Sequence, residues 1–290
     1  MNQHKASWLR REKAFAAFAT GPLLDFWHSR EELEFTGVGN LTLRYVRFTS
    51  PQHKRVILIV PGRIESYIKY PALAYDLFHC GFDVVILDHR GQGRSDRLLE
   101  DSHRGHVAEF THYVDDLETL YLKEIISGHY QQRYALAHSM GGAILTLFLA
   151  RQPQAFHAAA LLAPLFGINR LTHSTERYRR NLRFYADDPA IRVGGPTYHW
   201  VREGIHAGRN IISQVDKITT PLLLLQASDD RVVDNRSQDL FCAAMAAAGH
   251  PCEGNKPRVI DGARHEILFE KDEMRAEALN AVVDFFSSHH

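Results

Sequence analysis

Residues 132–151 combine a short apolar strand, a sharp turn and the start of a helix. The turn reads Ala137-His138-Ser139-Met140-Gly141-Gly142, which places a small residue two positions before and two positions after Ser139. Such a strand-to-helix turn strains the serine backbone and lifts its hydroxyl clear of the sheet, and the small neighbours avoid a collision. Ala137 departs from the usual Gly-x-Ser-x-Gly pattern, but no other serine in the chain has small residues at both positions. The segment predicts a nucleophile elbow that presents Ser139.

Composition excludes several classes of protein. The 290 residues contain 34 Lys and Arg against 34 Asp and Glu, so no excess of positive charge points to nucleic acid. The three cysteines, Cys80, Cys242 and Cys252, form neither a metal-ligand spacing nor an even disulfide framework, which favours a reducing compartment. The amino terminus lacks a secretory pattern, and no apolar stretch reaches the ~18 residues of a membrane span. We expect a cytoplasmic protein.

Peripheral contact with the inner face of the cell membrane is a further expectation. Residues 8–18 carry Trp8, Phe15 and Phe18 close to several basic side chains. This pattern suits an ordinary helix packed on the domain, and it also suits an interfacial helix.

Apolar runs and helical segments alternate along most of the chain. A run such as Val56–Val60 is typical of a strand buried on both faces of a sheet. The predicted strands are residues 41–48, 56–60, 83–87, 134–137, 158–163, 222–226 and 258–260. The predicted helices are residues 67–80, 114–126, 141–151, 238–248 and 272–286. This alternation predicts a single α/β domain over residues 1–290, with a mostly parallel central sheet flanked by helices.

Residues 165–220 interrupt this alternation. They carry arginines and aromatic residues where another strand and helix would stand. We therefore predict a short cap insertion over residues 165–220.

A serine nucleophile needs a histidine to accept its proton and an acid to orient that histidine. In parallel-sheet hydrolases with a nucleophile elbow, the acid and then the histidine follow the serine in the chain. The segment 224–233 offers Asp229 and Asp230 just past one predicted strand, and the segment 260–266 offers His265 past the next. Both lie at carboxyl ends of strands, where sites in parallel sheets collect. We predict His265 as the base and favour Asp230 over Asp229 as the acid.

Acyl transfer also needs backbone N–H groups directed at the oxyanion. One is expected from Met140, the residue after the nucleophile. The other is expected from Arg63, because Gly62 lets the loop after Val56–Val60 approach the substrate closely.

Neither a cofactor nor a metal is predicted. The segment Asp88-His-Arg-Gly-Gln-Gly-Arg-Ser95 follows a strand, but it lacks the third glycine and the downstream acid of a dinucleotide fingerprint. His103, His106 and His112 are close in sequence, yet no metal-binding spacing surrounds them.

With these residues assembled, the chain resembles the serine α/β-hydrolase superfamily. Within it, the chain is similar to the monoglyceride-lipase-like branch that includes the bacterial lysophospholipases of the PldB type. The elbow and residues 88–95 are superfamily-wide signals, whereas Pro61-Gly-Arg-Ile-Glu-Ser66 is a narrower one. The other matching segments are residues 21–27, 179–188 and 265–270. Two departures are Pro61-Gly62, where the superfamily usually has His-Gly, and a stretch at 167–175 that is shorter than the family leads us to expect.

The resemblance implies an α/β-hydrolase fold and a cofactor-free lysophospholipase that acts on a lysophospholipid or another monoacyl lipid. It assigns Ser139, Asp230 and His265 to the triad, with Arg63 and Met140 as oxyanion donors. Arg179 and Arg183 in the cap suit either a solvated helix face or the phosphate of the substrate. The alternatives are a monoacylglycerol lipase or general esterase, a serine peptidase of the same fold, and a non-catalytic binding module.

Overall fold

The computed structural model describes residues 8–9, 11–167 and 194–290. Within them, one eight-stranded sheet has the order β1-β2-β4-β3-β5-β6-β7-β8. The strands are β1 (Glu31–Thr36), β2 (Thr42–Phe48), β3 (Arg55–Val60), β4 (Phe82–Leu87), β5 (Gln132–His138), β6 (Ala158–Leu162), β7 (Leu222–Ala227) and β8 (Arg258–Ile260). β2 pairs antiparallel with β1 and β4, and every neighbouring pair from β4 to β8 is parallel. The expected α/β fold with a mostly parallel sheet is confirmed.

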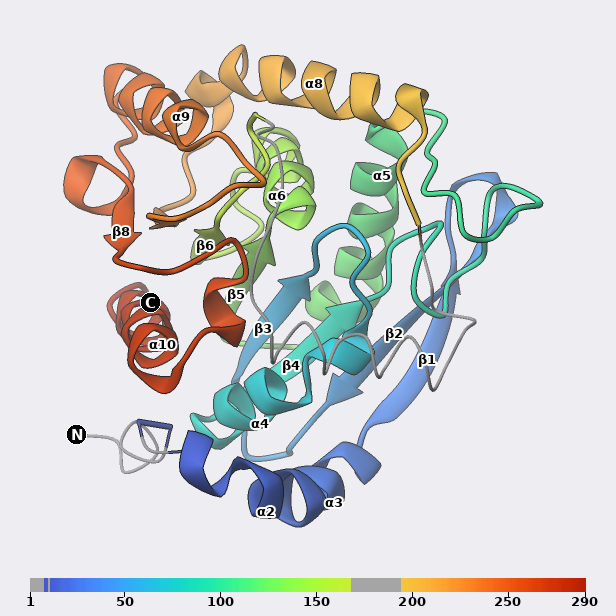
Figure 1. Cartoon of the computed structure of the whole chain (residues 1–290), viewed down its shortest axis with the longest axis vertical. Helices are drawn as coiled ribbons and strands as arrows, with labels where there is room; N and C mark the ends of the chain where they lie inside the picture. Colours follow the sequence, from blue (N-terminus) through green and yellow to red (C-terminus); the bar gives the residue numbers. More distant parts are fainter. Residues whose placement is uncertain (1–7, 10, 168–193) are drawn as a thin grey trace.

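Helices flank this sheet and connect its strands (Figure 1). The α-helices are α2 (Phe15–Thr20), α3 (Pro22–His28), α4 (Pro71–His79), α5 (Thr111–Leu120), α6 (Met140–Arg151), α8 (Tyr198–Ile212), α9 (Asn235–Ala247) and α10 (Asp272–Ser287). The 3₁₀ turns are η1 (Glu12–Ala14), η2 (Val38–Asn40), η3 (Tyr67–Lys69), η6 (Val215–Lys217), η7 (Glu253–Asn255) and η8 (Ile267–Phe269). A π-helical turn, η4 (Tyr121–Ile126), extends α5.

The core forms where the apolar runs of the sequence predict it. β3, β4 and β7 are buried almost throughout, and α6 is buried from Met140 to Ala150. α6 packs on α5 and also contacts β3 and β5. Because α6 has no polar face, it sits at the centre of the molecule, and the turn that precedes it is held on all sides.

Two of the expected helices differ from the sequence expectation, and β1, α3 and α8 lie where no strand or helix was expected. The helix expected over 67–80 is divided into η3 and α4, because Pro71 has no N–H to donate and begins a new helix. The helix expected over 114–126 begins earlier, at Thr111, and its last turn is π-helical. β1 was not expected, since its sequence Glu-Glu-Leu-Glu-Phe-Thr is highly charged. Such charge is common on an exposed edge strand, where it discourages pairing with another chain.

Of the predicted cap, residues 165–167 and 194–220 lie within the described part. They include α8, which lies across the ends of α5 and α6 (Figure 1). The indole N–H of Trp200 in α8 donates to the hydroxyl of Tyr113 in α5 over 3.2 Å. A Cβ on Gly208 would lie 2.4 Å from the carbonyl oxygen of Phe166, so α8 packs backbone to backbone on the segment after β6. None of the described helices is long and apolar enough to cross a bilayer.

Candidate active site

Ser139 occupies the turn between β5 and α6 with φ 52° and ψ −119°, a conformation that L residues rarely adopt. Its N–H donates to the carbonyl of Leu162 at 3.1 Å, and its carbonyl accepts from Gly142 and Leu165 at 2.9 Å each. A Cβ on Gly141 would lie 2.0 Å from the carbonyl oxygen of Val60, so no larger residue fits there. The strained turn is therefore held by hydrogen bonds and by close packing of α6 against the end of β3.

Asp230 lies just after β7, and its carboxylate binds His265. Its Oδ2 accepts from His265 Nδ1 at 2.8 Å, and its Oδ1 accepts the N–H groups of Val232 at 2.8 Å and Val233 at 3.1 Å. Burial alone raises the pKa of Asp230, but the hydrogen bonds from His265 and the backbone outweigh it and lower the pKa below its ordinary value. The neighbouring Asp229 instead pairs with Arg231 and Arg264. Of the two aspartates, only Asp230 contacts His265 in the described structure.

His265 connects this carboxylate to the serine. Its Nε2 lies 2.9 Å from Ser139 Oγ. With Nδ1–H donated to Asp230, the neutral ring leaves Nε2 as an acceptor for the serine hydroxyl proton. Burial lowers the pKa of His265 and the charge of the nearby His138 lowers it further, whereas Asp230 opposes the shift. A histidine that is neutral at pH 7 can act as a general base.

The loop after β3 lies against the serine. A Cβ on Gly62 would lie 3.1 Å from Ser139 Cβ, so glycine allows the loop to approach this closely. Met140 is the first residue of α6, where an N–H has no acceptor within the helix. Within the described part of the chain, no hydrogen bond occupies the N–H of Arg63. In the described structure, Met140 directly follows Ser139 in the chain and Arg63 directly follows Gly62, the residue packed against Ser139.

A buried carboxylate that the sequence analysis did not identify holds this loop and the elbow together. Glu65 accepts a hydrogen bond from the N–H of Gly62, from the hydroxyl of Tyr70 at 2.6 Å and from His138 Nδ1 at 3.2 Å. Lys69 neutralises it, and also binds Glu266 at 2.7 Å. The charge of Lys69 and the hydrogen bonds hold the pKa of Glu65 well below its usual range in spite of full burial, which raises it. The sequence signal that could have identified this pair is the spacing of Glu65 and Lys69, an acidic and a basic residue four positions apart just after Arg63.

His138 links Glu65 to His265. Its Nε2 lies 3.0 Å from the carbonyl oxygen of His265, while its Nδ1 faces Glu65. Both partners are acceptors, so each ring nitrogen must carry a proton, and His138 is an imidazolium. Burial lowers the pKa of His138, but the charge of Glu65 and its hydrogen bond raise it above the ordinary value, in agreement with the geometry. His138 thus positions His265 and places a positive charge beside it.

Residues 88–95 support the same loop from the other side. His89 Nε2 donates to the carbonyl of Pro61 at 3.0 Å, and the amide of Gln92 donates to the carbonyls of Gly62 and Glu65 at 2.8 Å each. Asp88 accepts from the hydroxyl of Ser66 at 2.9 Å and the N–H of Tyr67 at 2.6 Å. This glycine-rich segment thus holds the loop after β3 in place.

Two further expectations concern other parts of the chain. Arg179 and Arg183 lie outside the described residues. In the described part, no group of three His, Cys, Asp or Glu side chains could hold a metal ion.

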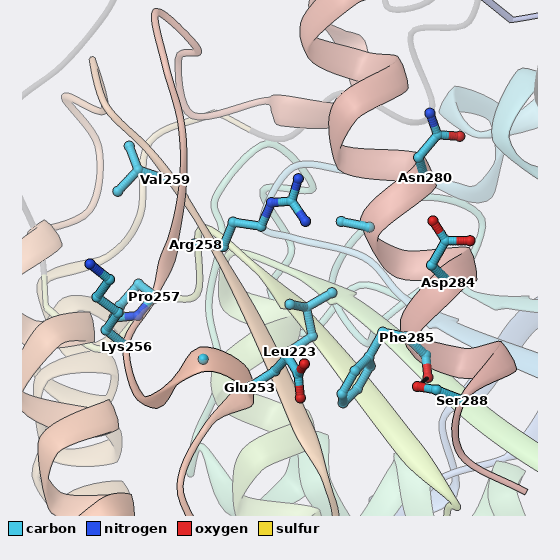
Figure 2. A pocket seen from close by; sticks show the side chains of 12 residues that line it. Leu223, Glu253, Lys256, Pro257, Arg258, Val259, Asn280, Asp284, Phe285 and Ser288 are labelled. Carbon is cyan, nitrogen blue, oxygen red and sulfur yellow. Dashed lines mark hydrogen bonds between the residues drawn. The ribbon is translucent and has the colours of Figure 1, made fainter.

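A pocket of about 680 Å³ lies away from this site, between β7, β8, η7 and α10 (Figure 2). Leu223 and Arg258, which line it, belong to the amino ends of β7 and β8, whereas Asp230 and His265 follow their carboxyl ends. In Figure 2, Arg258 projects toward Asn280 and Asp284 of α10. The pocket therefore lies at the amino ends of the strands, opposite the end that carries Asp230 and His265. Its lining includes both acidic and basic side chains, which do not favour one class of ligand.

Comparison with known proteins agrees with this geometry. The family model described as serine aminopeptidase, S33, matches residues 51–172 and 169–272. Lysophospholipase L2 of Escherichia coli (strain K12) is 55% identical over an alignment that covers 100% of this chain and 97% of that protein. The probable lysophospholipase L2 of Haemophilus influenzae is 32% identical, with 96% and 98% covered. A soluble variant of monoglyceride lipase from Saccharomyces cerevisiae superposes with a TM-score of 0.73 at 18% identity, over 90% of this chain and 96% of that one, which shows a shared fold.

The matched lengths and ranges differ in two respects from a continuous alignment of this chain. The alignment with the E. coli protein spans 330 residues, 40 more than the 290 of this chain. The two stretches matched by the family model meet at residues 169–172, inside the segment that we expect to be short.

The contacts of the two aspartates predict different effects of substitution. Asp230→Asn removes the charge that stabilises a protonated His265, and should slow labelling of Ser139 by a fluorophosphonate by on the order of 10⁴-fold. The matched variant Asp229→Asn loses only exposed ion pairs, which contribute about 0–1 kcal/mol, and should slow it by less than about fivefold. Rates of labelling under identical conditions check both. The reverse order would assign the acid to Asp229.

The charge on His138 predicts the direction of a pH shift. As the pH falls, the rate at which the fluorophosphonate labels Ser139 should decline, because His265 becomes protonated. The midpoint should lie below pH 6.5, because the pKa of His265 is lowered. His138→Gln removes the neighbouring positive charge, makes the His265 imidazolium less costly, and should move the midpoint to higher pH. The control His250→Gln, on a distant turn, should leave the midpoint in place. An unchanged or lower midpoint in His138→Gln would contradict a charged His138.

Proposed function

The chain belongs to the serine aminopeptidase S33 family of hydrolases, and from this premise we propose that it is a lysophospholipase that uses Ser139 as its nucleophile. The full-length identity of 55% to lysophospholipase L2 carries the choice of substrate. The hydrogen bonds from Ser139 to His265 and from His265 to Asp230 support the proposed chemistry. The enzyme removes the remaining acyl chain from a lysophospholipid.

The proposed reaction has two halves. Ser139 Oγ attacks the ester carbonyl while His265 Nε2 accepts its proton, and Asp230 stabilises the resulting imidazolium. The N–H groups of Arg63 and Met140 bind the oxyanion of the tetrahedral intermediate. His265 then gives the proton to the departing glycerol oxygen, which leaves an acyl-enzyme. Water, deprotonated by His265, attacks this ester and releases the fatty acid.

Two features of the site favour the early steps. The lowered pKa of His265 keeps the ring neutral before attack. The bonds from Glu65, His89 and Gln92 support a preorganised oxyanion loop, so little reorganisation is needed when charge develops.

The alternatives share this chemistry and differ in the substrate. A monoacylglycerol lipase or a general esterase would cleave neutral esters, a peptidase would cleave amides, and a binding module would cleave nothing. A release assay on a lysophosphatidyl lipid, the monoacylglycerol with the same acyl chain, and an aminoacyl anilide separates these four functions.

We expect the lysophosphatidyl lipid to be hydrolysed with the highest kcat/KM of the three. Ser139→Ala should lower this rate by on the order of 10⁶-fold, as in comparable triads, with an unchanged circular dichroism spectrum. Preference for the anilide would establish a peptidase instead. Near-normal hydrolysis by a folded Ser139→Ala protein would remove the serine from the mechanism.

The substrate is a membrane lipid, and we propose that the enzyme works at the cytoplasmic face with α8 against the bilayer surface. No disulfide joins Cys80, Cys242 and Cys252 in the described structure, which supports a reducing compartment. Tyr198, Ile205 and Ile212 are 97%, 45% and 40% exposed. They alternate with the exposed Arg202 and Arg209 at spacings that share one helix face. Glu203, the acidic residue of α8, accepts the N–H of Phe110 and lies 4.0 Å from Arg202, so it offsets part of the charge of Arg202 but not that of Arg209. Such a face suits an anionic lipid surface.

This contact predicts a change in vesicle binding. Ile205→Asp places a carboxylate in the exposed face of α8 and should reduce co-sedimentation with phosphatidylglycerol vesicles at low salt by several-fold. The matched control Leu240→Asp alters another exposed aliphatic residue, on α9, and should bind as the unaltered protein does. Equal binding by the two variants would place the contact elsewhere.

A further inference from the structure

The side chain of Arg63 bridges the oxyanion loop and the cap. Its Nη2 donates to the carbonyl of Gly194 at 2.7 Å, and its guanidinium lies 5.1 Å from the centre of the Trp200 ring. Both contacts belong to the cap, whereas Gly62, the preceding residue, is packed against Ser139. The guanidinium is thus held at the boundary of core and cap, one residue from the closest approach to the nucleophile.

No counter-charge contacts this guanidinium in the part of the chain that the structure describes. In the described residues, the four cations that are buried most deeply each contact a carboxylate: Arg11 and Arg275 contact Asp76, Arg90 contacts Asp116, and Lys69 contacts Glu65. No carboxylate in the same part of the chain lies within 4.0 Å of Arg63, and its Nε is buried without a hydrogen-bond partner. Burial lowers the pKa of Arg63 to about 10, which leaves it protonated at pH 7.

An unpaired charge with reduced access to water is costly, and proteins usually compensate for it with an ion pair. Of the five N–H donors of Arg63, the bond to Gly194 uses one, and it is the only hydrogen bond of this guanidinium within the described structure. The remaining donors form a planar fork that matches the oxygens of a phosphate or carboxylate. The fold therefore keeps a binding group for an oxyanion next to the site of acyl transfer.

The substrate of the proposed reaction carries such a group at a short distance from the bond that is cleaved. In a lysophospholipid, only the glycerol backbone separates the acyl ester from the phosphate. We propose that the side chain of Arg63 binds the phosphate of the lysophospholipid while its own backbone N–H faces the ester carbonyl. This role rests on the proposed lysophospholipase activity, and it makes one residue responsible for both catalysis and head-group selection.

A purely structural role for Arg63, as a link between Gly194 and Trp200, makes a different prediction. A link would affect every ester in the same proportion, because it would act through the shape of the site. A phosphate contact would affect only substrates that have the phosphate. Since the phosphate is charged before and during the reaction, the contact should change KM more than kcat.

The test is the ratio of kcat/KM for 1-myristoyl lysophosphatidylglycerol to kcat/KM for 1-myristoylglycerol, both presented in the same neutral detergent micelles. Arg63→Gln keeps the backbone N–H and should lower this ratio by about 10-fold to 100-fold, mainly through KM for the phospholipid. Arg63→Lys keeps the positive charge but lacks the planar fork. Its ratio should therefore lie between that of the unaltered enzyme and that of Arg63→Gln. The control Arg236→Gln removes an exposed guanidinium on α9 and should leave the ratio unchanged.

Two results would overturn the role of Arg63. Equal losses on both substrates in Arg63→Gln would assign the side chain to the structure of the site or to binding of the fatty acid that both substrates release, and would exclude a specific contact with the phosphate. No loss on either substrate would also remove the phosphate contact. In either case the unaltered enzyme still cleaves the phospholipid, whereas failure of that cleavage would contradict the proposed function itself.

Discussion

The carboxylate of Glu65 joins three segments that are far apart in the chain. It binds the loop after β3 through the N–H of Gly62, and it binds the turn before α6 through the imidazolium of His138. His138 in turn holds the carbonyl of His265, the proposed base. A buried charge is tolerated here because Lys69 pairs with it and the remaining lone pairs are used. The loop after β3, the turn at Ser139 and His265 therefore keep one geometry, because they share one hydrogen-bond network.

This network also influences the chemistry. A protonated His138 beside His265 disfavours a second imidazolium, which keeps the base neutral before it is needed. During turnover the same repulsion persists, and Asp230 offsets it from the other side of the ring. The base thus lies between a positive and a negative neighbour. Its proton affinity depends on their balance rather than on either charge alone.

Much of the fold could be predicted from the sequence, because the apolar runs of the sequence are the segments that are buried in the structure. The continuous apolar run of β3 and the apolar α6 are stable only inside an α/β sandwich. β1 was missed because an edge strand satisfies its backbone on one side only and carries charged side chains, so that no apolar alternation marks it. The division of residues 67–80 into η3 and α4 follows from Pro71, a local signal that the pattern of apolar residues obscured.

For the site, the amino-acid sequence by itself determined which residues stand at the turns: Ser139 between small neighbours, His265 and the two aspartates after strands, and Gly62 at the end of β3. These are local requirements of backbone geometry, and they are legible in short segments. Only the tertiary structure decided that Asp230 rather than Asp229 contacts His265 and that His138 carries two protons. It alone left Arg63 without a carboxylate partner in the described residues. Each of these depends on which groups meet across the fold, and distance and burial, not local spacing, set the charge of a side chain.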